Sequence, residues 1–148
     1  LSGTDVLSGK KFDDSIAYGS YRVDFHHSDQ PGITFRYLNG PEVVIPSRNG
    51  EKQVGRWREP VEVDPTFYQI PLRCLQQEKI PNLLMAGRMI DTDKVAFSAA
   101  RVMVNMNQTG EAAGVAAYLS IDANCPIQDV DAKSVQRKLT NGGSVDFR

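Results

Sequence analysis

Residues 80–88 read Ile-Pro-Asn-Leu-Leu-Met-Ala-Gly-Arg, and the interpretation of the chain depends on them. The continuous apolar run within 82–86 predicts a strand that is buried on both faces. A polar loop follows, and an Ala- and Gly-rich segment from about Asn105 to Ile121 then predicts a long helix. The exposed backbone N–H groups at the start of such a helix favour a site for an anionic or electron-rich ligand. A helix packed tightly on a sheet with nothing bound is the alternative explanation of the same pattern.

The start of this helix has recognisable signals. Asn105 is a suitable N-cap, and Gln108 stands three residues later, where the partner in a capping box belongs. Gly110 and Gly114 each cost about 1 kcal/mol of helix stability relative to alanine. We therefore expect another group to pack against the stripe that these two glycines form.

The regions on either side complete the expected fold. Residues 1–19 are polar and rich in Gly, Ser and Asp, which predicts an irregular segment. Near the other end, Asp131 can cap a short helix from Ala132 to Thr140, which Asn141-Gly142 ends. Between them, short apolar runs bounded by turn residues predict strands at 21–25, 33–37, 43–45, 53–57, 61–63 and 67–70. The predicted class is α+β: a mostly antiparallel sheet, then one buried strand, a long Ala/Gly-rich helix and a short C-terminal helix.

Composition excludes several kinds of partner. The 148 residues carry a net charge of -1 and 41% hydrophobic residues, as is typical of soluble globular domains. The basic residues are scattered, so neither nucleic acid nor an anionic membrane surface is an expected partner. No apolar run is long enough to span a bilayer, and the sequence does not define a compartment. Cys74 and Cys125 lack metal-ligand spacing, so no metal site is predicted; buried free thiols are preferred, with one disulfide as the alternative.

Several motifs in a consistent order resemble one known family. Residues 80–88 are similar to the last cofactor-domain strand of FAD-dependent oxidoreductases with two dinucleotide-binding domains. Arg101-Val102-Met103 and residues 110–117 resemble that family's Arg-Val-Met and Gly-Gln-Ala-Ala-Gly runs, with no gap between them. Phe67-Tyr68-Gln69-Ile70-Pro71-Leu72-Arg73 is similar to its Tyr-x-Ile-Pro-Tyr-Arg strand. The likeness runs from about residue 12 to 139.

The resemblance implies a cofactor and a division of the chain. Residues 1–75 would belong to a β-rich substrate region, and residues 76–148 would complete an FAD-binding domain. The long helix would point its N-terminus at the pyrimidine end of the isoalloxazine ring, where reduced flavin carries negative charge. The expected cofactor-binding residues are Gly87, Arg88, Asp91, Arg101, Met103, Asn105, Met106 and Asn107. For Asp91, a solvated loop acid is an equal alternative.

Two residues are candidates for substrate chemistry. Arg73 could clamp a substrate carboxylate, and a structural ion pair is its alternative. His26 or His27 could carry a proton near neutral pH, with His26 taken as the candidate, although a surface turn explains the pair more simply. The resemblance implies hydride transfer from a small-molecule substrate, which the sequence does not identify, to FAD.

The chain also departs from the family pattern. Many relatives have His where Lys94 stands, His-Gly-Ser where Phe97-Ser98-Ala99 stands, and Pro-Thr where Val104-Asn105 stands. These positions border the flavin and the substrate in the family, so acid–base roles there are not carried over.

The sequence contains no Gly-x-Gly-x-x-Gly, the motif that holds the ADP half of FAD. We therefore expect the chain to be a piece of a longer polypeptide, inactive alone, whose partner is the upstream part of that polypeptide. The isolated chain would cover its exposed apolar faces by self-association. A non-catalytic binding module and a subunit that docks on a separate flavin-binding chain are the alternatives.

Overall fold

The computed structural model describes residues 1–147. Its helices and strands are α1 (Gly3–Leu7), β1 (Ser15–Gly19), β2 (Val23–His26), β3 (Ile33–Arg36), β4 (Pro41–Ile45), β5 (Gln53–Arg56), β6 (Tyr68–Pro71), η1 (Leu72–Cys74), η2 (Gly87–Met89), α2 (Lys94–Ala100), α3 (Met103–Asp122), η3 (Ile127–Asp129) and α4 (Ala132–Asn141).

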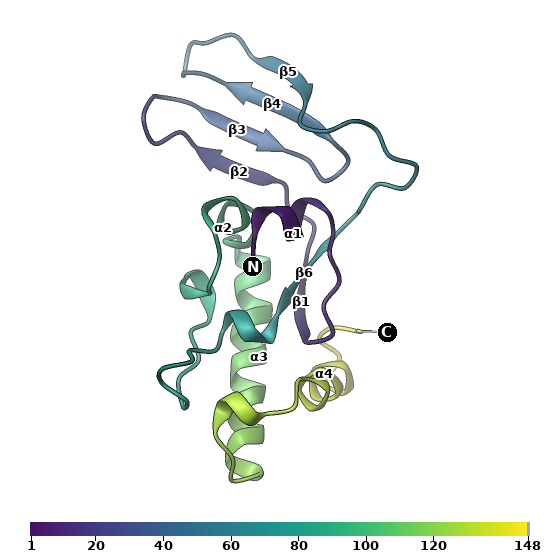
Figure 1. The fold of residues 1–148 in the computed structure, drawn as a ribbon, viewed down its shortest axis with the longest axis vertical. Coiled ribbons are helices and arrows are strands. Elements are labelled where there is room, and N and C mark those ends of the chain that lie inside the picture. Colours follow the sequence, from purple (N-terminus) through teal and green to yellow (C-terminus); the bar gives the residue numbers. More distant parts are fainter. Residues whose placement is uncertain (148) are drawn as a thin grey trace.

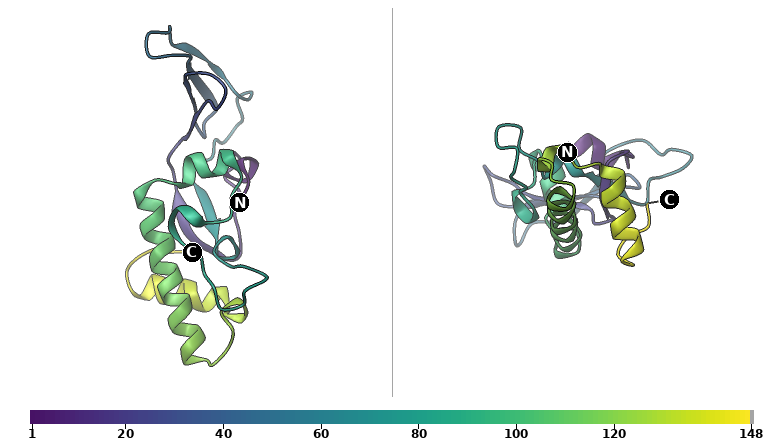
Figure 2. Two further views of the ribbon diagram at one scale, coloured as in Figure 1. Left: turned by 90° about the vertical axis from the view of Figure 1, so that its left-hand side faces the viewer. Right: turned by 90° about the horizontal axis from the view of Figure 1, so that it is seen from below.

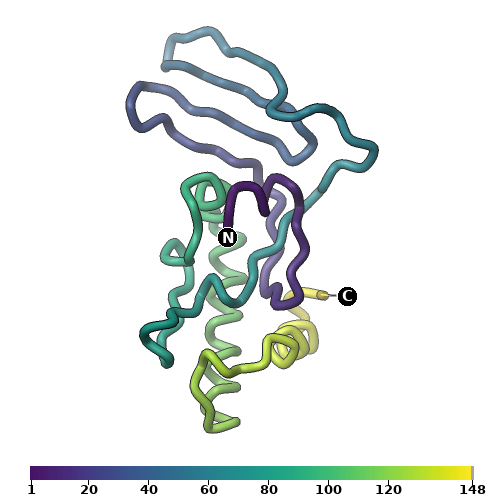
Figure 3. Tube along the Cα trace, in the orientation of Figure 1, coloured from purple at the N-terminus to yellow at the C-terminus, as the bar shows by residue number. Residues whose placement is uncertain are grey.

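The elements form two parts that lie one above the other along the long axis (Figure 1). The upper part is an antiparallel sheet in the order β2-β3-β4-β5, and the lower part holds the antiparallel pair β1-β6 with all four α-helices. The chain passes upward between β1 and β2 and returns between β5 and β6 (Figure 3). In a view turned by 90°, the four-stranded sheet projects beyond the helical part (Figure 2).

The hydrophobic core of the lower part lies around β1 and β6. All four residues of β6 are buried, and α3 and α4 both pack against β1. Ile16, Tyr68 and Ile70 are fully buried there. The N-terminal end of α3 points toward the four-stranded sheet (Figure 1), which brings the start of the helix to the junction between the two parts.

The predicted α+β class is confirmed, with antiparallel sheets, a long helix and a short C-terminal helix. Five of the expected strands are present as β2 to β6. The expected strand at 61–63 is wrong, because these residues form an exposed connection in which Val63 is 81% exposed. The division of the chain at residue 75 stays a prediction.

The irregular segment expected over residues 1–19 is wrong, because it contains α1 and β1. A capping box starts α1, in which the Ser2 hydroxyl accepts from the Asp5 backbone N–H and the Asp5 carboxylate accepts from the Ser2 backbone N–H. Val6 and Ile16 of this segment are fully buried. A few apolar residues inside a polar composition thus supply part of the core.

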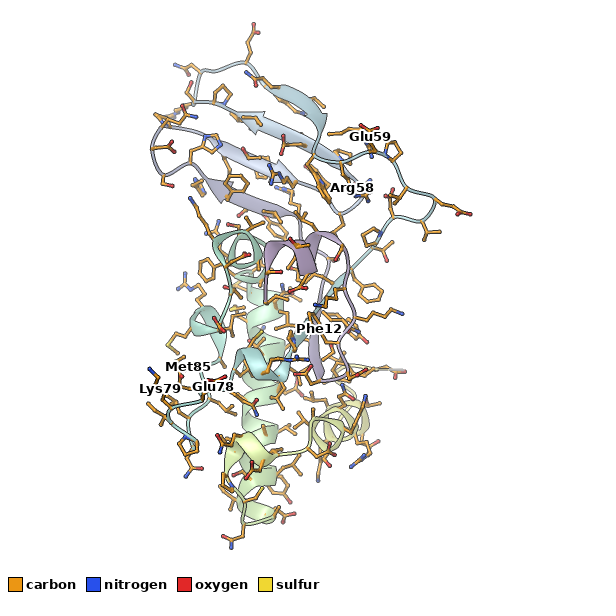
Figure 4. The ribbon with its side chains drawn as sticks, in the orientation of Figure 1. Phe12, Arg58, Glu59, Glu78, Lys79 and Met85 are labelled. Carbon is orange, nitrogen blue, oxygen red and sulfur yellow. The ribbon has the colours of Figure 1, made fainter. Side chains whose placement is uncertain are left out.

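The strand expected over 82–86 is also wrong. These residues form no strand, and their one bridge in the described chain joins Leu84 to Gln76. The Met85 backbone N–H donates to the Leu75 carbonyl at 2.7 Å, and the Met85 side chain lies on an outer loop with Glu78 and Lys79 (Figure 4). Residues 83–86 are half-buried, because residues 1–147 place no sheet strands on both sides of them.

The long helix begins earlier than expected. Its N-cap is Val102, so the prediction of Asn105 as N-cap with Gln108 as its capping-box partner is wrong. Both side chains bond to other elements instead: Asn105 to Tyr68, and Gln108 to Tyr18. These contacts with β6 and β1 replace local capping.

Two other local predictions are confirmed. Asp131 caps α4 by accepting from the backbone N–H groups of Lys133 and Ser134, and Gly142 follows the last helical residue. Cys74 and Cys125 are both free thiols, but the expected burial holds for Cys74 and not for Cys125, which is half-buried.

The stripe of α3 that contains Gly110 and Gly114 is open. Apart from the adjoining residues and backbone of α3 itself, nothing in the described chain lies within 4 Å of a Cβ placed at either glycine. Met103 and Ile121, at helical spacing along the same stripe, are 82% and 81% exposed. The expected packing partner is therefore not supplied by residues 1–147.

Candidate functional site

An open cavity of about 810 Å³ lies where the N-terminus of α3 meets the four-stranded sheet. This size is within the usual range of small-molecule sites. Its walls come from the end of β1 and the β1–β2 connection, the β3–β4 turn, the segment before β6, and the N-cap and first turn of α3. The lining residues are Tyr18, Ser20, Tyr21, Arg22, Tyr37, Leu38, Asn39, Pro65, Thr66, Val102, Met103, Val104 and Asn105.

The first turn of α3 presents its backbone to this cavity. Val102 has no polar side chain with which to cap the helix, and the first turn contains no acidic residue. The Met106 backbone N–H donates to the Val102 carbonyl at 3.1 Å, so the donors left outside the helical pattern belong to Met103, Val104 and Asn105. These N–H groups and the helix dipole make this wall of the cavity electropositive.

A buried hydrogen-bond chain fixes this turn. The Asn105 side-chain amide donates to the Tyr68 hydroxyl at 2.9 Å, and that hydroxyl donates to the Ala99 carbonyl at 2.9 Å. Burial raises the pKa of Tyr68 to about 12, although the hydrogen bond from Asn105 acts in the opposite direction. These two hydrogen bonds connect the end of α2 and the start of α3 to β6.

A second bond pattern fixes the next turn of the helix to β1. The Gln108 side chain accepts from the Tyr18 backbone N–H and donates to the Tyr18 carbonyl, each at 2.9 Å. Tyr18 itself lines the cavity. The helix start and the β1 wall are therefore held in one arrangement.

The ion pair between Arg101 and Asp24 closes the junction between α2 and β2. The Arg101 guanidinium lies 2.6 Å from an Asp24 carboxylate oxygen and also donates to the Asp24 carbonyl at 3.3 Å. The other carboxylate oxygen accepts from the Tyr21 hydroxyl at 2.8 Å. This bond, with burial, raises the pKa of Tyr21. Asp24 is thus fully engaged beside the cavity.

Arg22 differs from these residues because its charge has no acidic partner within residues 1–147. Its Nε atom is buried and has no hydrogen-bond partner in the described chain. The guanidinium carbon lies 4.5 Å from the Phe35 ring centroid, 5.1 Å from that of Tyr21 and 5.6 Å from that of Tyr37. Aromatic faces attract a cation without neutralising it.

The structure brings some of the predicted cofactor-binding residues together. Met103 and Asn105 line the cavity, and Asn107 is exposed one turn further along α3. Gly87 lies against the same helix, where its backbone N–H donates to the Thr109 hydroxyl at 3.4 Å. Gly87 has a φ of 70°, a left-handed conformation that glycine adopts without strain.

Other predicted residues lie outside the cavity lining. Arg88 is exposed on η2, Met106 is half-buried on α3, and the backbone N–H of Asp91 donates to the Cys74 carbonyl at 2.8 Å. Arg101 does not line the cavity; it bonds to Asp24, which also accepts from the cavity-lining Tyr21. The role of each in cofactor binding stays a prediction.

The two candidates for substrate chemistry lie elsewhere. Arg73 forms a two-pronged ion pair with Asp14 and lies over the Phe12 ring, which Figure 4 labels. Burial alone would raise the pKa of Asp14, but the bonds and charge of Arg73 hold that pKa below its usual value. His26 is exposed at the end of β2. Neither residue lines the cavity, and their catalytic roles stay predictions.

The sequence analysis did not identify Arg22 or the aromatic rings that surround it. One signal was available, because Phe35 and Tyr37 alternate along a strand and therefore share a face of the sheet. Antiparallel pairing of Val23 with Arg36 then brings Arg22 opposite Tyr37. The residues next to Arg22 in the sequence do not indicate that its charge lacks an acidic partner in residues 1–147, because this depends on the fold.

Within residues 1–147, no group of His, Cys, Asp and Glu side chains is arranged to hold a metal ion. No helix in that range combines the length and the apolar character needed to cross a membrane. Comparison with protein families matches residues 1–139 to the family described as FAD dependent oxidoreductase. No curated protein and no solved structure matched the chain.

Proposed function

The chain belongs to the FAD-dependent oxidoreductase family, and we propose that it completes the flavin site of such an enzyme at the N-terminus of α3. The observation that carries this proposal is the uncapped first turn of α3, which opens onto a cavity bounded on its far side by the four-stranded sheet. The helix would contact the cofactor, and the sheet would contact a small organic substrate.

The available donors suit the pyrimidine end of a flavin. Met103, Val104 and Asn105 present backbone N–H groups there, and no acidic side chain stands in that turn. When bound, FAD would accept at its ring the hydride that a substrate carbon loses. A positive helix end stabilises the negative charge that develops near N1 and O2 on reduction.

The surrounding residues hold these donors in place before a ligand arrives. Tyr68 fixes Asn105 from β6, and Gln108 fixes the next turn to the Tyr18 backbone. Donors that need no rearrangement stabilise developing charge most effectively. The rigid junction of α2, α3, β1 and β6 is thus the main contribution of this chain to the chemistry.

The open stripe of α3 supports the second part of the proposal. We infer that a dinucleotide-binding segment, in the upstream part of the same polypeptide, packs against Gly110 and Gly114. It would supply the Gly-x-Gly-x-x-Gly that residues 1–148 lack. The left-handed turn at Gly87 and the exposed Arg88 lie close to the same helix, where they would meet the ribityl or pyrophosphate groups. Without that segment the chain would be inactive and would self-associate through this stripe.

A charge placed at the helix start tests the proposal. Val104 lines the cavity and is 68% exposed, so Val104→Asp adds a carboxylate beside the donors with little loss of packing. Val54→Asp, on the exposed strand β5, is the matched control. In the flavin-loaded product of the intact gene, Val104→Asp should lower the flavin reduction potential and the flavin content, and the control should change neither. Equal potentials and flavin contents in the two variants would contradict the proposal.

A further inference from the structure

We propose that Arg22 is the anchor for a carboxylate group of the substrate, and that the substrate class is a small carboxylic acid with an apolar body. The inference rests on the proposed function, because it takes the sheet side of the cavity as the substrate side. It also moves the carboxylate clamp from Arg73, where the sequence suggested it, to a residue that the sequence did not single out.

The groups that line the cavity favour an anionic ligand. Of the lining residues, Arg22 alone is charged, and the other electropositive group is the first turn of α3. A cavity with two positive features and no acidic side chain in its lining favours an anion over a neutral or cationic ligand.

Arg22 lacks the hydrogen-bond partner that a buried polar atom usually has. A buried polar atom without a hydrogen-bond partner is unfavourable, so such atoms are rare in folded proteins. The Nε atom of Arg22 is one of them. By contrast, the other partly buried arginines of the sheet region have acidic partners: Arg36 with Glu42, Arg58 with Asp64, and Arg101 with Asp24. Among the partly buried arginines of the sheet region in residues 1–147, Arg22 therefore differs in having no acidic partner.

The neighbouring acid does not supply the missing partner. Asp24 stands two residues away, but one of its carboxylate oxygens is taken by Arg101 and the other by Tyr21. The Tyr21 hydroxyl donates its proton to Asp24. The ion pair and the phenol keep Asp24 from neutralising the Arg22 guanidinium.

The aromatic rings hold the guanidinium in a usable form. Phe35, Tyr21 and Tyr37 surround it at 4.5–5.6 Å and restrict its rotamers while leaving its charge intact. An arginine stacked in this way can present two parallel N–H groups to a carboxylate. Leu38, Pro65 and Val102 in the same lining would contact the apolar body of the acid.

A titration of the chain with benzoate and with benzamide tests this inference. The two probes have nearly the same shape, but only benzoate carries a charge. The measurement is the side-chain Nε–H signal of each arginine in an ¹⁵N NMR spectrum; the Arg22 signal is the one absent from Arg22→Lys. Arg22→Gln removes the charge, Arg22→Lys keeps the charge without the two-pronged donor, and Arg48→Gln removes a charge at the exposed β4–β5 turn as the control.

We expect benzoate to shift the Arg22 signal and to bind at least tenfold more tightly than benzamide. Binding should weaken at least tenfold in Arg22→Gln and by a smaller factor in Arg22→Lys, which retains the stacked cation and the fold, and it should not change in Arg48→Gln. Equal affinity for the two probes, or benzoate binding unchanged in Arg22→Lys and Arg22→Gln, would overturn the inference. Because the readout does not involve flavin, this failure is distinct from failure of the proposed function, which the flavin content and potential of the Val104→Asp protein report.

Discussion

The side-chain amide of Gln108 spans both backbone polar groups of Tyr18, accepting from its N–H and donating to its carbonyl at 2.9 Å each. The Gln108 side chain thus makes the two hydrogen bonds to the β1 backbone that an adjacent strand would otherwise make. This contact joins the helix that presents the cavity donors to the strand that forms another wall of the cavity.

Replacing Gln108 should therefore destabilise the fold. Gln108→Ala leaves the Tyr18 N–H and carbonyl without these partners, at a cost of about 2–3 kcal/mol in the free energy of unfolding. Denaturant unfolding measures the change. Gln128→Ala, at an exposed glutamine of η3, is the control and should change the free energy of unfolding by less than about 0.5 kcal/mol. Equal effects of the two substitutions would show that the amide contact is not structural.

Tyr68 should make stability depend on alkaline pH. Its pKa is raised to about 12 in the folded chain, against about 10 when unfolded, so the folded state holds the proton more tightly. The resulting stabilisation is complete below pH 10 and is lost as the pH rises toward 12, by up to about 3 kcal/mol. Unfolding measured from pH 8 to pH 12 should show this loss relative to Tyr68→Phe. Tyr118→Phe, at a 53% exposed tyrosine, should keep the wild-type slope; a wild-type slope in Tyr68→Phe as well would refute the assignment.

Asp14 should act at the opposite end of the pH range. Arg73 holds the pKa of Asp14 below its usual value, so the contribution of the pair is present above that usual value and is lost as the pH falls through the folded-state pKa. Because the Arg73 side chain is 62% exposed, the contribution should not exceed about 1 kcal/mol. The stability difference between wild type and Asp14→Asn should shrink from pH 7 to pH 2. Asp29→Asn, at an exposed turn, should show no such difference at either pH.

Gly114 should respond differently in the chain and in the flavoprotein. A Cβ at this position meets nothing in the described residues, so Gly114→Ala should stabilise the isolated chain by up to about 1 kcal/mol. Gly114→Trp should instead block the packing of a dinucleotide-binding segment and lower the flavin content of the intact gene product. Gly55→Trp provides a matched control, because Gly55 is equally open but lies on β5. Loss of flavin in both tryptophan variants would count against the packing of a dinucleotide-binding segment on the open stripe of α3.

Local signals predicted the elements whose partners are local. Asp131 caps α4 through its own next two or three residues, so the sequence sufficed to place that helix. Asn105 has the same capping chemistry, but Tyr68, from a strand 37 positions away, takes its side chain. A tertiary contact thus overrode a local preference, and the helix starts at Met103 instead.

The strand predicted from the apolar run over 82–86 is absent for a related reason. Its composition suits burial on two faces, but a strand also needs backbone partners, and residues 1–147 supply one bridge. The candidate site shows the same limit. The motifs indicated the region of residues 101–107, although the predicted N-cap was three residues too late. The surroundings of Arg22 depend on the ion pair between Asp24 and Arg101, which is 77 residues later than Asp24.

The most direct test of the central claim is the visible absorbance spectrum of the intact gene product, purified without added cofactor, beside that of residues 1–148 incubated with FAD and then desalted. We predict a flavin spectrum in the intact product and none in the shorter chain, because the proposal assigns the ADP-binding half of the site to another segment. An intact product that remains colourless after incubation with FAD would contradict the claim that this cavity serves a flavin.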